Sequence, residues 1–400
     1  MLPFSRVKRR AFVKGAGAVA VVAAGGLVWR AYDQGVFSAG AGAAYEPWTN
    51  WRSDAAPGPL GLVRAGILAA SPHNTQPWFF QVGATRIDLF ADTARNLGAF
   101  DPYLREMHIG LGCALENMMR TARVLGYEVA VTLYPGPLAA APVSPRPQPV
   151  ATLALSPARP RPDQLVEAIP RRHTDRGAYA AGRPVPGEML EAMWAAFQDD
   201  ADLRLFLFSA PAERKQFGDL VLSATETIIA DPAMVAASDR WFRHRWLDVQ
   251  RRRDGLTLDA VALGPLVTVM SKLMPPASAE TSHRYWRDAT RDVQIPTSAL
   301  FGLIAVRDLY DRPQALRAGQ RWQRLHLMAT ARGLAMQPIN QPVEMVDRER
   351  ELGKAPRAAA ALAALTGEAG WKPTFAFRAG VPTRPAGPSP RRPVDAVVLG

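Results

Sequence analysis

Apolar residues recur with helical spacing in two segments that lie 207 residues apart. Between Gly112 and Gly126 they form a stripe at three- and four-residue steps, the pattern of an amphipathic helix that a glycine can end. This stripe comprises Leu115, Met118, Ala122 and Leu125. Trp322, Leu325 and Ala329 occupy the same offsets between Gly319 and Gly333. The equal spacing predicts two related halves, although two unrelated amphipathic helices would also give such a stripe.

Short apolar runs predict strands beside each helix, so the pattern indicates a mixed α and β fold. The strand candidates are Trp78 to Val82, Ile87 to Phe90, Leu203 to Phe208 and Ala299 to Val306. Nine prolines between Pro135 and Pro162 forbid a long helix there and leave room for a short strand near Val150 to Leu155. This segment is the predicted connector between the halves. The proline-rich end, Lys372 to Gly400, is predicted to lie extended across a surface.

Two polar clusters stand out from this framework. The first runs from Ser71 to Trp78 and reads Ser-Pro-His-Asn-Thr-Gln-Pro-Trp, and the second runs from Arg171 to Arg176 and reads Arg-Arg-His-Thr-Asp-Arg. Prolines fix the first loop so that little ordering entropy is lost on binding. Each arginine alone is typical of a solvated surface, and only their clustering favours a binding site.

Residues 45–400 resemble the nitroreductase family of FMN proteins, and especially its fused twin-half, Acg-like branch. The resemblance rests on the loop Asn74-Thr75-Gln76-Pro77-Trp78, the cluster Arg172 to Arg176 and the tail Arg391-Arg392. It implies an α+β nitroreductase-like fold with two tandem halves that form an intramolecular pseudo-dimer. The implied divisions are a signal or tether at 1–43, a first half at 44–160, and a second half at 161–400 with a lid at about 235–280.

The resemblance implies one FMN per chain in a pseudo-dimeric monomer. The reciprocal site lacks its parts, because Tyr45 to Trp48 replaces a basic cluster and Gln294 to Thr297 replaces the loop. FMN is the reactive group, so no protein side chain is assigned a catalytic role. The implied cofactor-binding residues are Ser71, His73, Asn74, Gln76, Arg172, His173, Thr174, Arg176, Asn340, Gln341, Arg391 and Arg392.

Particular roles follow from the chemistry of this cofactor. A phosphate dianion requires guanidinium and hydroxyl donors, which favours Arg172, Thr174 and the pair Arg391-Arg392. Arg176 resembles the family residue that stabilises negative charge on the reduced ring. The segment Met336 to Pro342 resembles the loop near flavin N5, but Asn340-Gln341 stands where Glu-Gly is usual. That segment is equally readable as a turn bounded by prolines.

Composition excludes other classes of site. The net charge of +12 arises from dispersed arginines without a nucleic-acid fold signature, so no nucleic-acid partner is predicted. The single cysteine, Cys113, cannot form an internal disulfide, and the six histidines form no metal motif. His108 is interpreted as structural, at the start of the first-half helix after Asp101 and Pro102.

The N-terminus predicts export. Lys8-Arg9-Arg10-Ala11-Phe12-Val13-Lys14 precedes an apolar stretch from Gly15 to Val28, which resembles a twin-arginine signal. The stretch is short for a bilayer span, and a periplasmic location or a tether at the outer face of the inner membrane follows. The twin-arginine export machinery is therefore a predicted partner, and membrane contact through the N-terminus is open.

Two functions remain at this stage. One is an FMN oxidoreductase with ping-pong transfer from a donor such as NADH or NADPH to a small nitroaromatic or quinone acceptor. The alternative is an FMN storage or sequestration protein with little turnover. The segment Trp241 to Asp254, in which arginines alternate with aromatic residues, is interpreted as an amphipathic insertion that covers the site.

Overall fold

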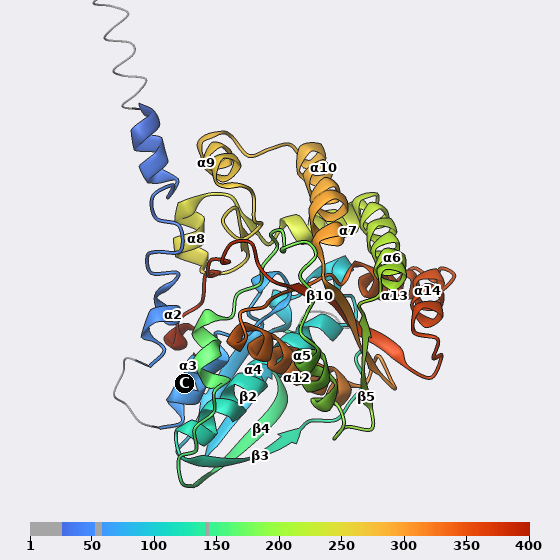
Figure 1. The fold of residues 1–400 in the computed structure, drawn as a ribbon. Coiled ribbons are helices and arrows are strands. Elements are labelled where there is room, and N and C mark those ends of the chain that lie inside the picture. Colours follow the sequence, from blue (N-terminus) through green and yellow to red (C-terminus); the bar gives the residue numbers. More distant parts are fainter. Residues whose placement is uncertain (1–25, 53–57, 141–143) are drawn as a thin grey trace, which may run out of the picture.

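The computed structural model describes residues 26–52, 58–140 and 144–400, and it has an α+β fold with two main sheets and helices around them (Figure 1). The predicted twin-arginine motif at 8–14 lies outside the described residues, as does most of the apolar stretch after it. Residues 26–33, at the end of that stretch, are helical.

The first sheet is built mainly from the first 160 residues. Its strand order is β11-β1-β2-β4-β3, and only the β1–β11 pair is parallel. The bounds are β1 Trp78–Val82, β2 Arg86–Ala91, β3 Tyr127–Leu133, β4 Gln148–Pro157 and β11 Val398–Leu399. Ile87, Leu89 and Ala91 are buried along β2 and alternate with less buried residues, which is the period-two pattern of a half-buried strand. The predicted strands at 78–82 and 87–90 are confirmed.

Strand β4 corrects the view of the connector. A short strand at 150–155 is predicted, whereas β4 has 10 residues and lies between β2 and β3 inside the sheet. The register against β2 shifts between Leu89 and Phe90, next to Pro149. Such an irregularity accommodates a proline, which has no N–H for the ladder. Strand β3, at the sheet edge, was not predicted.

The second sheet has the order β5-β8-β10-β9 and is antiparallel throughout. Its bounds are β5 Leu203–Phe208, β8 Leu300–Val306, β9 Ala335–Pro338 and β10 Lys372–Gly380. Every residue of β8 is buried, as expected for a strand covered on both faces. The predicted strands at 203–208 and 299–306 are confirmed.

The C-terminal segment follows the prediction of a surface tail only in part. Residues 372–380 form β10, in which every residue after Lys372 is buried. The chain then crosses from the second sheet to the first, where β11 pairs with β1. Arg391 becomes only 3% exposed on the way. Residues 381–389 are partly or fully exposed, as predicted for a surface tail, and among the last twenty residues only Pro390, Arg391 and Val397 are buried. The segment joins the two sheets and brings Arg391 to the cavity described below.

Helices α4 (Arg105–Val124) and α12 (Arg312–Ala331) pack against each other at the centre of the molecule. Each helix begins seven residues before the glycine that opens its predicted stripe, which is Gly112 for α4 and Gly319 for α12. The Asp101 carboxylate accepts hydrogen bonds from the N–H groups of Glu106 and Met107, and Asp311 caps α12 through the Gln314 N–H. These acidic residues satisfy donors that the helix itself cannot.

The contact between α4 and α12 is reciprocal. A Cβ atom on Gly112 would clash with the Leu316 carbonyl, and one on Gly319 would clash with the Ile109 carbonyl. Leu316 stands 207 residues after Ile109, as Gly319 does after Gly112.

The polar side chains between α4 and α12 also pair reciprocally across the 207-residue offset. Arg324 donates to Glu116 at 2.8 Å, and Gln323 donates to Asn117 at 2.9 Å. Such exchange of equivalent positions is the geometry of a two-fold contact. It supports the prediction of two related halves.

The remaining helices surround the two sheets, with α8, α9 and α10 together at the top of Figure 1 and α6, α13 and α14 beside the second sheet. Two short parallel strands, β6 (Phe242–Arg243) and β7 (Leu256–Thr257), lie within the predicted lid. The helices are α2 Glu46–Asn50, α3 Leu60–Gly66, α5 Gly187–Ala195, α6 Pro211–Ile229, α7 Pro232–Asp239, α8 Trp246–Arg252, α9 Pro265–Leu273, α10 Ala279–Ala289, α11 Ile295–Thr297, α13 Gln341–Glu351 and α14 Arg357–Thr366.

Among the described residues, no single helix has the length and apolar composition needed to cross a membrane. The bent pair α6 and α7, which meet at 89°, meets the criterion by length and composition only.

Candidate functional site

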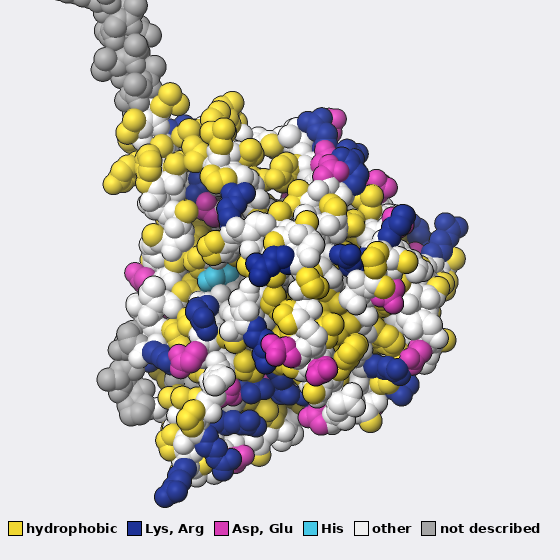
Figure 2. Space-filling view, viewed as in Figure 1, with side chains coloured by type: hydrophobic (Ala, Val, Ile, Leu, Met, Phe, Trp, Pro, Cys, Tyr) yellow, Lys and Arg dark blue, Asp and Glu magenta, His cyan; other side chains and the backbone are white. Residues whose placement is uncertain are grey.

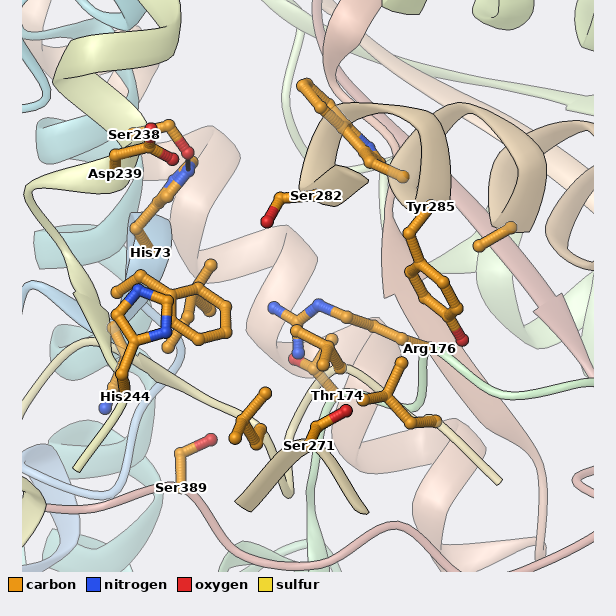
Figure 3. A pocket seen from close by; sticks show the side chains of 18 of the residues that line it. His73, Thr174, Arg176, Ser238, Asp239, His244, Ser271, Ser282, Tyr285 and Ser389 are labelled. Atoms are coloured by element: carbon orange, nitrogen blue, oxygen red, sulfur yellow. Dashed lines mark hydrogen bonds between the residues drawn. The ribbon is translucent and has the colours of Figure 1, made fainter. Parts of the chain in front are cut away.

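A cavity of about 1210 Å³ is lined on one side by the insertion that contains α7 to α10. Its walls come from the N-terminal helix, the loop after α3, the basic cluster, the insertion and the start of α13. Figure 3 shows His73, Thr174 and Arg176 around the cavity, with Ser238, His244 and Tyr285 contributed by the insertion. Binding pockets usually measure about 300–1,000 Å³, so this one is somewhat larger than the usual range.

The loop Ser71 to Gln76 is held in an unusual conformation at the cavity wall. His73, Asn74 and Gln76 have positive φ values of 44°, 55° and 51°, which cost non-glycine residues about 1–3 kcal/mol each. The loop is secured by the Ser71 hydroxyl, which accepts from the Gln76 N–H at 3.0 Å. Asn74 donates to the Pro390 carbonyl at 2.9 Å and thereby ties the loop to the tail.

Gln76 and Arg392 lie outside the cavity lining. The Gln76 amide donates to the Arg253 carbonyl at 2.8 Å and accepts from the Arg392 N–H at 2.8 Å. The Arg392 guanidinium donates to the Gln76 and Ala396 carbonyls. These two residues therefore join the loop, the insertion and the tail, and their contact with a cofactor stays a prediction.

Arg172 and Arg391 form the most distinctive charge arrangement in the cavity. Both guanidinium groups are buried, and both line the cavity. Arg172 donates to the Leu68 carbonyl at 3.1 Å, and Arg391 donates to the adjacent Ala69 carbonyl at 3.2 Å. In the described part of the chain, neither has a carboxylate partner, and the Nε atom of each has no hydrogen-bond acceptor.

Burial is the main reason that both cations are destabilised. It lowers the pKa of Arg172 to about 10. The pKa of Arg391 falls well below its usual value because of burial and then because of the charge on Arg172. The Trp48 ring, 4.6 Å from the Arg391 guanidinium carbon, offers cation–π stabilisation but no negative charge. Two neighbouring buried cations with unused donors fit a dianion such as the phosphate of FMN.

Thr174, Arg176 and His173 continue this basic wall. Arg176 reaches into the cavity in Figure 3 and donates to the Ala260 carbonyl at 3.1 Å. Burial lowers its pKa to about 10. Burial, followed by Arg172 and Arg391, lowers the pKa of His173 to about 3, and its Nδ1 atom has no partner among the described residues. His173 is therefore neutral at physiological pH.

His73 connects the loop to the insertion. Its Nε2 atom lies 2.9 Å from the Ser238 hydroxyl at the end of α7, as the dashed line in Figure 3 marks. Burial and then Arg176 lower its pKa to about 4, so the ring is neutral. The contact shows that residues predicted as a lid pack directly on the predicted loop.

The opposite wall carries acidic groups that sequence reasoning missed. Glu106, at the start of α4, accepts from the Asn340 amide at 2.7 Å, and Glu344, on α13, lies beside it. Glu344 is buried, and its Oε2 atom has no hydrogen-bond partner within the described residues. The one indication of Glu344 in the sequence is its helical spacing from the predicted site residues, because positions 340, 341 and 344 lie on the same face of a helix.

Desolvation makes these carboxyl groups hold protons. It raises the pKa of Glu106 to about 8, with Asp101 as the next cause. The pKa of Glu344 is raised well above its usual value by burial and then by Glu106. The charge on Arg105 offsets these rises in pKa only in part, and Arg105 itself pairs with Asp347 at 2.7 Å. At neutral pH this pair therefore presents a carboxylic acid to the cavity.

Asn340 and Gln341 line the cavity but differ in availability. Besides donating to Glu106, Asn340 accepts from the Ala376 N–H at 2.8 Å, so its amide is committed to the protein. The Gln341 Oε1 atom has no partner within the described residues. The predicted turn at 336–342 is in fact strand β9 followed by the start of α13.

Comparison with known proteins gives one extensive similarity. The chain is 28% identical over 348 residues to "Putative NAD(P)H nitroreductase Rv3131" of Mycobacterium tuberculosis strain H37Rv, over 84% of this chain and 90% of that protein. The same values hold for "Putative NAD(P)H nitroreductase MT3217" of Mycobacterium tuberculosis strain CDC 1551. No family model matches the chain. The chain is thus similar to proteins named as NAD(P)H nitroreductases.

Solved structures with partial overlap also carry nitroreductase names. One is the FMN and NADPH-dependent nitroreductase NfnB of a Sphigopyxis strain, with a TM-score of 0.38, 16% identity, and coverage of 59% of this chain and 98% of that one. Another is a nitroreductase with bound FMN from Desulfitobacterium hafniense, with a TM-score of 0.34, 11% identity, and coverage of 58% and 95%.

Proposed function

We propose that this protein is an FMN-binding, nitroreductase-like oxidoreductase with one flavin per chain. The observation that carries the proposal is the pair of buried guanidinium groups, Arg172 and Arg391, on the wall of a large cavity. Each has a free donor and neither has a carboxylate, so a phosphate dianion would compensate both. Similarity to proteins named NAD(P)H nitroreductases supports the same assignment.

The residues present fit the phosphate and one ring edge of FMN. Arg172, Arg391 and the Thr174 hydroxyl would hold the phosphate, and Arg176 would face the ring edge that becomes negative on reduction. Gln76 and Arg392 have a supporting role in this proposal, because they hold the loop in position without lining the cavity.

Bound FMN supplies two-electron chemistry, accepting from NADH or NADPH and passing on to a nitroaromatic or quinone in a ping-pong sequence. The chain contributes binding, exclusion of water and a proton. Glu344 holds its proton in a buried position that faces the cavity, where a reduced acceptor oxygen requires one. The insertion covers the cavity and limits which acceptors can enter.

The alternative is storage or sequestration of FMN with little turnover. It is favoured by the coverage from the insertion and by Asn340, whose amide is committed to Glu106 and Ala376. We also propose that the protein is exported. An exported location would favour sequestration over turnover, because nicotinamide donors are scarce outside the cytoplasm.

The deciding experiment is a flavin stoichiometry followed by anaerobic mixing with NADPH or NADH and then with a nitroaromatic or quinone. One flavin per chain, reduced and reoxidised at catalytic rates, supports the reductase. One flavin that resists reduction supports sequestration. Absence of flavin binding refutes both, and a ratio near two refutes the single-site pseudo-dimer.

A further inference from the structure

A group of exposed apolar side chains surrounds one side of the cavity mouth, and we call it the apolar collar. Nine of the fourteen large apolar side chains exposed in the described structure belong to it. Figure 2 shows them as yellow side chains gathered at the top of the molecule, over α9 and the N-terminal helix. The collar comprises Leu27, Val28, Trp29, Tyr32, Phe37, Leu266, Val267, Met270 and Met274. Scattered exposed apolar residues are normal, but such a concentration marks a contact surface.

Helix α9 is amphipathic in the reverse sense to an ordinary surface helix. Leu266 is 75% exposed, and Val267 and Met270 are about half exposed. The charged residue of the helix, Lys272, is buried instead and pairs with Asp259 at 2.8 Å. A surface helix in water normally turns its apolar stripe toward the core. Within residues 26–52, 58–140 and 144–400, the outward stripe of α9 therefore has no apolar partner.

The N-terminal helix and α9 form one surface because polar contacts join them. The Arg30 guanidinium donates to the Leu273 carbonyl, and Lys272 donates to the Gly35 carbonyl at 3.1 Å. These contacts direct the charged groups inward and leave Trp29 and Tyr32 outside, where they are 68% and 73% exposed. Tryptophan and tyrosine are the residues enriched at the interface between lipid and water.

The collar is continuous with the cavity. Trp29, Leu266, Val267, Met270 and Met274 line the cavity and also belong to the exposed surface. A ligand that enters between α9 and the N-terminal helix therefore meets these apolar side chains, beside the polar residues Arg30, Asp33 and Gln34 of the same lining. A mouth of this kind suits a lipophilic molecule better than a charged one.

The chain that precedes the collar indicates its partner. Twenty-five residues come before Gly26, with an apolar stretch from Gly15 that runs into Val28 and basic residues from Lys8 to Lys14. The apolar stretch thus joins the collar, and the basic residues favour an anionic surface, as does the net charge of +12. A protein partner or a second copy would not require this sequence.

We propose that the apolar collar docks onto an anionic lipid bilayer, so that the cavity opens toward the acyl chains and admits a ligand dissolved in the bilayer. The docking stands independently of the bound cofactor. That the ligand is an acceptor of the quinone class rests on the proposed function.

The test uses the full chain and places one exposed cysteine in the collar. Cys113 is buried, so Leu266→Cys can be labelled alone with an environment-sensitive dye, and Leu352→Cys, 43% exposed on α13's C-terminal side, is the matched control. With phosphatidylglycerol-containing vesicles, we expect a blue shift and quenching by spin-labelled lipid at position 266 and neither at 352. A dye that remains in water at 266 would overturn docking by the collar, even if the N-terminus binds the vesicle.

A second measurement separates the collar from the N-terminus. The triple variant Leu266→Ser, Val267→Ser and Met270→Ser should reduce vesicle partitioning roughly tenfold or more, since three apolar side chains are lost from the contact. The control Leu125→Ser, Trp194→Ser and Leu352→Ser removes exposed apolar side chains elsewhere and should have no effect. Equal loss in both variants would refute a specific collar.

Quinone reduction distinguishes the two proposals. With a long-chain quinone in vesicles, a second collar variant, Val28→Ser, Tyr32→Ser and Phe37→Ser, should lose kcat/KM while retaining the rate with a short water-soluble quinone, because these three exposed side chains do not line the cavity. Reduction of neither quinone by a docked protein refutes the reductase function and leaves docking supported. Equal rates for the variant and the unaltered protein in vesicles refute delivery through the collar.

Discussion

Arg172→Met separates the contribution of the buried cation to stability from its contribution to phosphate binding. Methionine retains most of the apolar volume but removes the charge. In the flavin-free protein the change sacrifices the hydrogen bond to Leu68 at 3.1 Å and a marginal one to His326 at 3.5 Å. It also removes the charge that disfavours ionisation of Arg391.

The two effects on the flavin-free protein oppose each other. Replacing buried ions by apolar side chains is often neutral or stabilising by about 1–4 kcal/mol, whereas an unpaired Leu68 carbonyl costs about 1–3 kcal/mol. We therefore expect the free energy of unfolding to stay within about 1 kcal/mol of its original value, or to rise. FMN binding has no such compensation, because truncating a buried charge partner costs about 2–5 kcal/mol. The affinity should fall between about 30-fold and several thousand-fold.

The assay compares FMN with riboflavin, which lacks the phosphate, by quenching of flavin fluorescence. Arg172→Met should weaken FMN binding by at least about 30-fold while riboflavin binding changes by less than about threefold. Arg332→Met, at an exposed arginine after α12, is the matched control and should alter neither. Equal weakening of both ligands would show that Arg172 supports the fold of the cavity rather than the phosphate, and unchanged FMN binding would remove the main basis of the proposed function.

Three further predictions concern the acidic wall and the central helices. Glu344→Gln should slow reoxidation by a quinone about 10²-fold without changing FMN affinity, and an unchanged stopped-flow rate and pH profile would exclude a proton-donor role. Burial raises the pKa of Glu106 to about 8, against 4.5 in the unfolded chain, so between these pH values the native state binds more protons than the unfolded state. The free energy of unfolding should therefore fall as the pH rises across this range. Glu106→Gln should flatten this pH dependence in urea titrations. Gly319→Ala should destabilise by about 1–3 kcal/mol or more, because its Cβ would clash with the Ile109 carbonyl, whereas Gly187→Ala meets open space and should not lower the melting temperature.

Much of the regular structure was predictable because local periodicity decides it. The strands at 78–82 and 203–208 match β1 and β5. The two glycine-bounded stripes match α4 and α12, except that Leu125 follows the end of α4 and is 41% exposed. Strand β10 was missed because Lys-Pro at its start resembles a loop. Its burial depends on pairing with β8 and β9, from distant parts of the sequence, which no local pattern reveals.

The site was only partly predictable for a related reason. Residue type identified Arg172 and Arg391 as candidate phosphate donors, and the structure places both on the cavity wall. Residue type alone could not show that the Gln76 side chain donates to the Arg253 carbonyl and accepts from the Arg392 N–H. Nor could it reveal Glu344, because an isolated glutamate on a helix is normally solvated. Burial and the neighbouring Glu106 change its chemistry.

The layout of charge makes the stability of this cavity depend on its ligand. Arg172, Arg391 and Arg176 have pKa values lowered by burial, so the empty site is electrostatically unfavourable, and a bound dianion stabilises the native state by mass action. A twin-arginine signal, which remains a prediction here, directs proteins that fold before export. A cavity that is most stable when filled would then favour loading in the cytoplasm, where FMN is available. The proposed cofactor and the proposed export route therefore support each other, and flavin-free variants such as Arg172→Met should be exported less well than Arg332→Met.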